Sequence, residues 1–239
     1  MFVGKKVWIS ELASIAVMSV LLVALLSVSF VILRNEFAIR NLDHDIAALR
    51  AKNVSKEKEI GVMRERLRLI TLLDAVVGER VTPAAIYRLA DLVYDNSRSY
   101  GYDPELLLAV IAVESKFNPE ALGRYRGGGL SGALGLMQLK YPTALSVAKM
   151  LGIEGLKRQD LMDPETNIIL GTAYLTTLIS RFKSFKLGII AYNLGPGTVR
   201  STLSRREALP MRYYEKVLAQ YYMLKKMGEE LDREGSAAN

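Results

Sequence analysis

The sequence has no cysteine and a single histidine, and each scarcity excludes a class of chemistry. Without cysteine the chain forms neither disulfides nor thiolate metal sites. His44 lies in a charged helical stretch and is most simply a solvated surface residue. The C-terminal part therefore lacks the cysteine and histidine side chains that a zinc mechanism or a Ser-His-Asp mechanism requires. We expect no metal and no cofactor.

Long runs of charge of one sign are also missing. The formal net charge is +7, yet the basic residues are scattered and interleaved with acidic ones. There is no basic recognition helix and no aromatic stacking platform of the kind that binds nucleic acid. We therefore expect no nucleic-acid partner, whereas the net charge suits an anionic polymer of another kind.

A long apolar run follows a short N-terminal flank, residues 1–11. From residue 12 to residue 33 the chain carries no charge, and a helix of that length crosses a hydrocarbon layer of about 30 Å. We predict a transmembrane helix at 12–33. The alternative is a cleaved signal peptide, whose charged start Lys5 and Lys6 resemble. Its apolar region is usually only about 7–15 residues long, and no small-x-small site follows before Arg34.

Residues 35–78 show a heptad pattern, which predicts a coiled-coil stalk. With Ile39 at position a, the a series is Ile39, Ile46, Asn53, Ile60 and Leu67, and the d series is Leu42, Leu49, Lys56, Met63, Ile70 and Val77. Three g positions face an e position of opposite charge: Asp45 with Arg50, Lys52 with Glu57, and Glu59 with Arg64. This pattern favours a parallel homodimer through residues 39–77. A single amphipathic helix against its own domain is the alternative, since Lys56 and Gly61 interrupt the seam.

The remaining chain reads as a compact helical domain at 82–227 with a flexible tail at 228–239. Thr82-Pro83, Asp103-Pro104 and Asp163-Pro164 are each typical of a helix start. Further helices are expected at 143–151, 168–179, 186–193 and 211–227. No strand hairpin is convincing, and 127–130 and 195–197 read as loops. The predicted fold class is all-α.

One glutamate stands out in this domain. Residues 106–113 form an unbroken apolar stretch, so the helix from Pro104 is expected to be buried nearly all round and to present Glu114 in its last turn. Burial raises the pKa of a carboxyl, which allows it to act as a general acid. A solvated glutamate at a surface helix end is the plain alternative.

Several short blocks carry a family resemblance. They are Glu114-Ser115-Lys116-Phe117-Asn118-Pro119, Gly132-Ala133-Leu134-Gly135-Leu136-Met137-Gln138, Asp163-Pro164 with Asn167-Ile168, and Ala191-Tyr192-Asn193 with Gly195-Pro196-Gly197. In this order they resemble the soluble-lytic-transglycosylase-type catalytic domain, a lysozyme-like helical fold.

The resemblance implies roles for individual residues. It assigns the single catalytic acid/base to Glu114, and it places Gln138, Tyr192, Asn193 and Ser131 along the substrate groove, with the Tyr192 hydroxyl close to the catalytic carboxyl. It implies cleavage of peptidoglycan glycan strands between N-acetylmuramic acid and N-acetylglucosamine, with 1,6-anhydromuramic ends. The basic flanks of the apolar run do not decide the topology, so we take it from the implied substrate. Because that substrate is the cell wall, the resemblance implies a single-pass protein of the cytoplasmic membrane with an extracytoplasmic catalytic domain.

Alternatives remain at this stage. A hydrolytic muramidase of the same fold and a non-catalytic peptidoglycan-binding scaffold fit the same blocks. The chain also departs from the family pattern: segment 123–131 is longer than usual and basic, and Lys140-Tyr141-Pro142 replaces a Met-Pro pair. The Glu-Thr element before the final Tyr213-Tyr214 pair is absent.

Overall fold

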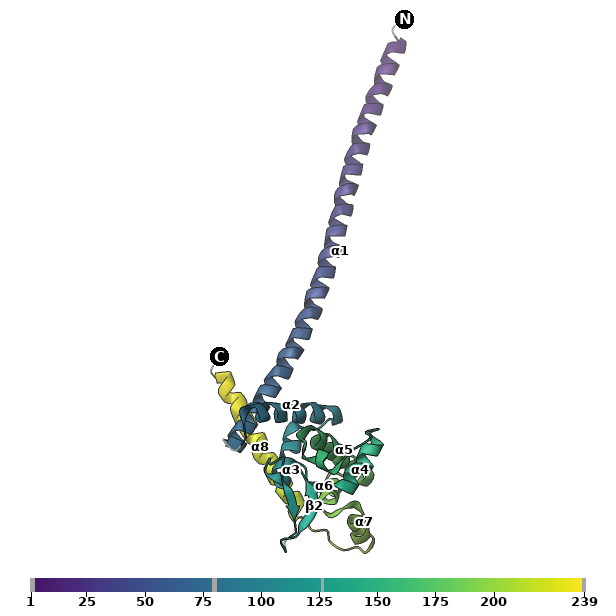
Figure 1. The fold of residues 1–239 in the computed structure, drawn as a ribbon. Coiled ribbons are helices and arrows are strands. Elements are labelled where there is room, and N and C mark those ends of the chain that lie inside the picture. Colours follow the sequence, from purple (N-terminus) through teal and green to yellow (C-terminus); the bar gives the residue numbers. More distant parts are fainter. Residues whose placement is uncertain (1–2, 79–80, 126, 238–239) are drawn as a thin grey trace. The chain divides into compact units, whose positions relative to one another are not determined.

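The computed structural model describes residues 3–78, 81–125 and 127–237. These residues are mainly helical, with one small sheet (Figure 1). They fall into two compact units, residues 1–62 and residues 63–239.

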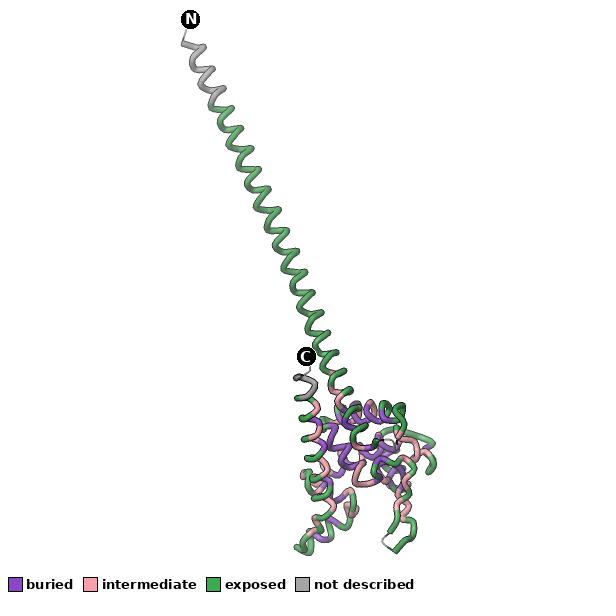
Figure 2. The backbone as a smooth tube through the Cα atoms, turned by 90° about the vertical axis from the view of Figure 1, so that its left-hand side faces the viewer, coloured by how far each residue is buried: buried purple, intermediate pink, exposed green. Residues whose placement is uncertain are grey.

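Helix α1 (Val3–Val77) is the long N-terminal helix. It includes the apolar run, and by length and composition it is the helix of the described chain that is able to cross a membrane. Its residues from Ser14 to Gly61 are exposed, as the green stretch in Figure 2 shows. The predicted end of the helical pattern near Gly78 is confirmed.

The second unit is built from further helices. They are α2 (Pro83–Tyr100), α3 (Pro104–Ser115), α4 (Tyr141–Met150), α5 (Pro164–Phe182), α6 (Phe185–Leu194), α7 (Pro196–Ser204) and α8 (Arg212–Ala237), with a short 3₁₀ helix at Arg158–Met162. The expectation of a loop at 195–197 was wrong, because α7 begins there. The segment expected as a flexible tail from residue 228 is helical to Ala237.

The three predicted helix starts are confirmed, although they are capped differently. The side chains of Thr82 and Asp163 accept hydrogen bonds from backbone N–H groups of the first turn. Asp103 makes no such bond. Its carboxylate instead accepts hydrogen bonds from Tyr221 and Lys225 of α8, so this residue joins α3 to α8.

A three-stranded antiparallel sheet was not expected from the sequence. Strands β1 (Leu122–Arg124), β2 (Leu130–Leu134) and β3 (Leu139–Lys140) lie in the order β1-β2-β3. The expected loop at 127–130 therefore ends in the first residue of β2. These strands are short and glycine-rich and lack the alternation of apolar and polar residues that marks longer strands.

Helix α3 lies in the core, as its sequence predicted. Residues 106–111 are all buried, each at most 5% exposed. The last turns of α1 also belong to this unit and contribute buried side chains to its core, namely Leu69, Leu72, Leu73 and Val77. Arg68 forms an ion pair of 2.6 Å with the buried Glu105 of α3. The compact unit thus begins at Met63, earlier than the boundary expected at residue 82.

Candidate active site

Glu114 lies in the last turn of α3, where the buried helix reaches an open cavity. Removal of the carboxyl from water raises the pKa of Glu114 from 4.5 to about 7. A hydrogen bond from the Tyr213 hydroxyl to Oε1, 2.5 Å long, opposes this rise because it stabilises the charged form. A carboxyl with a pKa near neutrality is able both to donate and to accept a proton at physiological pH.

The hydroxyl that contacts Glu114 belongs to Tyr213 of α8. Tyr192, whose hydroxyl the resemblance places close to this carboxyl, is near enough for Glu114 to affect its pKa, but it donates its hydrogen bond to the carbonyl oxygen of Met137, at 2.8 Å. Burial is the main cause that raises the pKa of both phenols well above 10, and the nearby Glu114 adds to it. Both hydroxyls therefore stay protonated and act as hydrogen-bond donors.

Two cavities meet at Glu114. The larger, of about 670 Å³, extends along the sheet toward α5 and α6, and the smaller, of about 580 Å³, extends toward the start of α8. Val113, Glu114, Asn193 and Leu194 line both cavities. The carboxyl thus borders open space on two sides.

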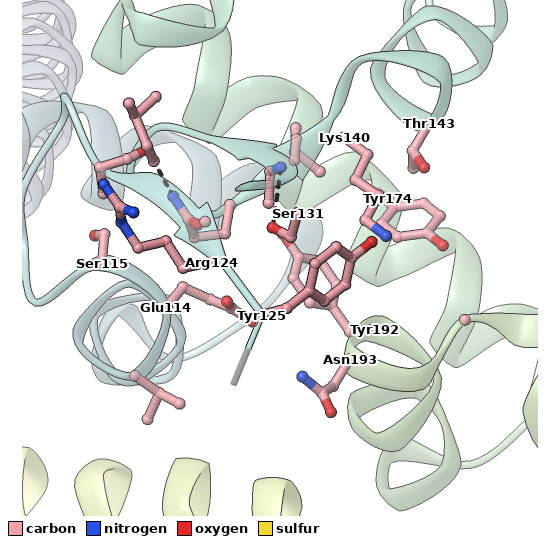
Figure 3. Close-up of a pocket in the computed structure, with 18 of the residues that line it drawn as sticks. Glu114, Ser115, Arg124, Tyr125, Ser131, Lys140, Thr143, Tyr174, Tyr192 and Asn193 are labelled. Carbon is pink, nitrogen blue, oxygen red and sulfur yellow. Dashed lines mark hydrogen bonds between the residues drawn. The ribbon is translucent and has the colours of Figure 1, made fainter. Parts of the chain in front are cut away.

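All five residues that the sequence singled out line the larger cavity: Glu114, Ser131, Gln138, Tyr192 and Asn193. In the view of Figure 3, Glu114 and Arg124 lie on one side of this cavity and Lys140 and Tyr174 on the other. Ser131 and Tyr192 lie between them. The sequence blocks, which are far apart along the chain, therefore come together in one place.

Gln138 shapes the wall of the cavity. Its Nε2 donates hydrogen bonds to the carbonyl oxygens of Ala121 and Gly135, both at 2.9 Å. A Cβ at Gly123 would lie 2.4 Å from Ser131 Oγ and 2.7 Å from Gln138 Oε1. Glycine at 123 is therefore what allows β1 to approach these two polar side chains.

Asn167 of α5 supports the loop that carries Met137 and Gln138. This fully buried side chain accepts a hydrogen bond from the Met137 N–H at 2.7 Å. Its amide donates to the carbonyl oxygens of Leu134 and Leu161. Asn167 thereby satisfies three backbone groups inside the core, and it fixes the Met137 carbonyl that receives the Tyr192 hydroxyl.

Metal-ligating side chains are not gathered in the described part of the chain, where no three His, Cys, Asp or Glu residues form a cluster. The polar groups around Glu114 are hydroxyl, amide and basic side chains. Such groups bind sugars and anions by hydrogen bonds and charge.

Comparison with known proteins gives a consistent family match. Residues 91–214 match the family described as the transglycosylase SLT domain. Membrane-bound lytic murein transglycosylase C of Photorhabdus laumondii is 41% identical over 128 residues, and the protein of the same name from Sodalis glossinidius is 37% identical over 129 residues. The matches cover 49% and 50% of this chain and 34% of each relative, so the chain spans about a third of these relatives' length.

Among solved structures, the 70 kDa soluble lytic transglycosylase of Escherichia coli is similar with a TM-score of 0.49 and 30% identity. The match covers 57% of this chain and 24% of that protein. An inactive mutant of the lytic transglycosylase Slt of Pseudomonas aeruginosa is similar with a TM-score of 0.44 and 26% identity, over 65% of this chain and 25% of that one.

Proposed function

Because the chain belongs to the transglycosylase SLT family, we propose that it is a membrane-anchored lytic transglycosylase that cleaves the glycan strands of peptidoglycan. The relatives named as membrane-bound lytic murein transglycosylases support this activity. The bond cut is the one between N-acetylmuramic acid and N-acetylglucosamine.

One observation carries the proposed mechanism. Glu114 is the single acidic side chain among the residues that line the two cavities in the described chain. A hydrolytic glycosidase ordinarily uses two carboxylates, the second as nucleophile or as the base that activates water. A site with one carboxyl, whose pKa is raised to about 7, favours a reaction in which the same group acts first as acid and then as base.

The proposed reaction proceeds in two proton transfers. Protonated Glu114 donates its proton to the glycosidic oxygen, and the C1–O bond breaks while the N-acetyl oxygen stabilises the positive charge at C1. The Glu114 carboxylate then takes the proton of the muramic C6 hydroxyl as that oxygen bonds to C1. The product is a 1,6-anhydromuramic end, and no water is consumed.

Tyr213 and Tyr192 have distinct parts in this scheme. The Tyr213 hydroxyl stabilises the carboxylate that forms after the first proton transfer, because its hydrogen bond favours the charged form of Glu114. Tyr192, held by the Met137 carbonyl, forms a wall of the larger cavity beside Asn193. Ser131 from β2 and Gln138 from the loop between β2 and β3 present oxygen atoms to the sugar.

Substitution of Glu114 tests this function. In detergent-solubilised full-length protein, Glu114→Gln is expected to lower the release of soluble muropeptides from peptidoglycan by about 10²–10⁴-fold while binding persists. Glu154→Gln, at an exposed position outside both cavities, is the matched control and retains activity. If the wild-type protein binds peptidoglycan and releases nothing, the chain is a binding scaffold and the proposal fails.

The apolar part of α1 supports a membrane anchor. Residues 12–33 carry no charge, and the helix is long enough to cross a bilayer. The relatives are themselves named membrane-bound. We place this helix as a single span of the cytoplasmic membrane, with the catalytic domain on the outer side, where peptidoglycan lies.

The heptad stripe of α1 supports a parallel homodimer. Large apolar side chains at a and d positions are exposed in the single chain, for example Ile39 at 58% and Leu49 at 60%. In the last turns of the helix Leu67 is 62% exposed, whereas Leu69 and Leu72 are buried in the core. Val77, at position d, is buried in the core as well, so the a and d side chains that are open to a partner precede this end of the helix. The opposite charges at g and e positions suit a second copy as partner.

A further inference from the structure

The charged side chains around Glu114 are all basic. Lys116, Arg124 and Lys140 line the larger cavity, and Arg212 and Lys216 line the smaller one. A groove of this composition attracts anions on both sides of the catalytic carboxyl.

None of these five bases has a carboxylate within 4.0 Å among the described residues. Some basic residues elsewhere in the same unit are paired, such as Arg66 with Asp91 and Asp95, and Arg88 with Asp163 and Glu165. The bases of the groove therefore keep their charge available to a ligand.

Arg124 and Lys140 are the two bases that the sheet presents to the larger cavity. Arg124 is the last residue of β1, and its Nη1 donates a hydrogen bond to the Gly128 carbonyl at 3.3 Å. Lys140 ends β3, paired with Ala133 of β2, and its Nζ lies 6.0 Å from the centre of the Tyr125 ring. The strand pairing fixes where both side chains start, and Figure 3 shows them reaching the cavity from opposite sides.

The proposed substrate offers these bases a definite anion. The amino-sugar backbone of peptidoglycan carries no charge where the lactyl group of muramic acid is joined to peptide by an amide bond. Its free carboxylates then belong to the stem peptides, which branch from the sugar next to the bond that is cut. The basic side chains of the cavity therefore find no charged partner on the glycan, whereas the carboxylates of the stem peptides have the opposite charge.

We propose that Arg124 and Lys140 bind carboxylates of the stem peptide and make the enzyme select strands with negatively charged stems. This inference rests on the proposed function and names the part of the substrate that the sheet recognises. Exposed ion pairs are individually weak and are screened by salt. Two such pairs are expected to change kcat/KM by about tenfold at low ionic strength, and the difference is expected to shrink in about 0.5 M salt.

The test compares two forms of one substrate. Peptidoglycan with free stem carboxyls is divided, and one half is converted to carboxamides with a carbodiimide and excess ammonia, which removes the charge and leaves the glycan unchanged. Full-length wild-type protein in detergent is expected to cleave the free form with a kcat/KM about tenfold higher than the amidated form. The double variant Arg124→Gln/Lys140→Gln is expected to cleave both forms with equal kcat/KM.

A matched control removes two charges elsewhere. Lys149→Gln/Arg158→Gln changes two exposed bases that line neither cavity, and it is expected to keep the wild-type preference. An Arg124→Gln/Lys140→Gln variant that still prefers the free form as strongly as wild type would overturn the proposal. So would a control pair that loses the preference to the same extent, because net charge rather than the two sheet residues would then be responsible.

A binding measurement separates this inference from the proposed activity. In the Glu114→Gln background, co-sedimentation with free-carboxyl peptidoglycan is expected to weaken severalfold when Arg124 and Lys140 are replaced, and with the amidated form it is expected not to change. If the wild-type protein cleaves neither form while this binding difference is present, the activity fails and stem recognition stands. If binding does not distinguish the variants, stem recognition fails whatever the activity.

Discussion

The Tyr213 hydroxyl donates a 2.5 Å hydrogen bond to Oε1 of Glu114, and the two residues lie 99 positions apart in the chain. Their backbones are held by the packing of α8 on α3, and at the other end of α3 Tyr221 and Lys225 bind Asp103. Polar contacts at both ends of α3 thus fix the register of the two helices. This register is what brings a buried phenol to the Glu114 carboxyl.

Removal of the Tyr213 hydroxyl is expected to change the pH profile. The hydrogen bond lowers the pKa of Glu114 against the larger effect of burial, so in Tyr213→Phe this pKa rises above about 7. The decline of kcat at high pH, which reflects deprotonation of Glu114, is expected to move to higher pH. The maximum kcat is expected to fall, because the Glu114 carboxylate no longer accepts a hydrogen bond from the Tyr213 hydroxyl. Tyr214→Phe is the control, since no hydrogen bond joins Tyr214 to Glu114. An unchanged profile in Tyr213→Phe would contradict the assigned role.

The raised pKa of Glu114 also predicts how stability depends on pH. Below about pH 4.5 the carboxyl is protonated in both the folded and the unfolded chain. Between about 4.5 and 7 the unfolded chain releases the proton first, so the free energy of unfolding falls as pH rises, and above about 7 this loss is complete. Glu114→Gln has no such loss. The melting temperature of Glu114→Gln minus that of wild type is expected to be larger at pH 8 than at pH 4. An equal difference at the two pH values would refute the raised pKa of Glu114.

The helices were largely predictable because their signals are local. A proline after Thr82, Asp103 or Asp163 marks the first turn, and the apolar run from Leu106 marks a buried helix. The sheet was missed because β3 has only two residues and β1 only three. Helix α7 was missed because Gly195-Pro196-Gly197 has the composition of a turn, although Pro196 fits a first helical turn.

The site was predictable only in part. Each motif block is a short local pattern that identified one or two residues, and all five residues lie on one cavity. Tyr213 was not assigned a role because its contact spans nearly half the chain and the Glu-Thr element before it is absent. The Tyr213-Tyr214 pair was the available signal. The hydrogen-bond partner of Tyr192 could not be predicted either, because the Met137 carbonyl is a backbone group that no side-chain pattern indicates.

Two leucines on the last turns of α1 are expected to differ in their effect on stability. Leu72 is fully buried, so Leu72→Ala is expected to lower the free energy of unfolding of the catalytic domain by about 2–5 kcal/mol. Leu67 is 62% exposed, and Leu67→Ala is expected to change it by less than about 0.5 kcal/mol. Thermal unfolding followed by near-ultraviolet circular dichroism distinguishes them. Equal losses would show that α1 does not pack as described.

The proposed dimer predicts a position-dependent crosslink. The chain has no cysteine, so a single introduced thiol gives an unambiguous result. In a parallel coiled coil two copies of Leu49 face each other at position d, close enough for a disulfide, whereas Val54 at position b points outward. Oxidation of membranes is expected to crosslink Leu49→Cys and to leave Val54→Cys monomeric. Crosslinking of neither variant, or of both equally, would argue against the dimer.

The central claim is that Glu114 serves as the single acid/base of a reaction that consumes no water. It is tested most directly by mass spectrometry of a peptidoglycan digest made by the full-length protein in H₂¹⁸O. The account predicts muramic ends that are one water lighter than reducing ends and carry no ¹⁸O. Reducing muramic ends that carry ¹⁸O would show a hydrolytic muramidase and contradict the account.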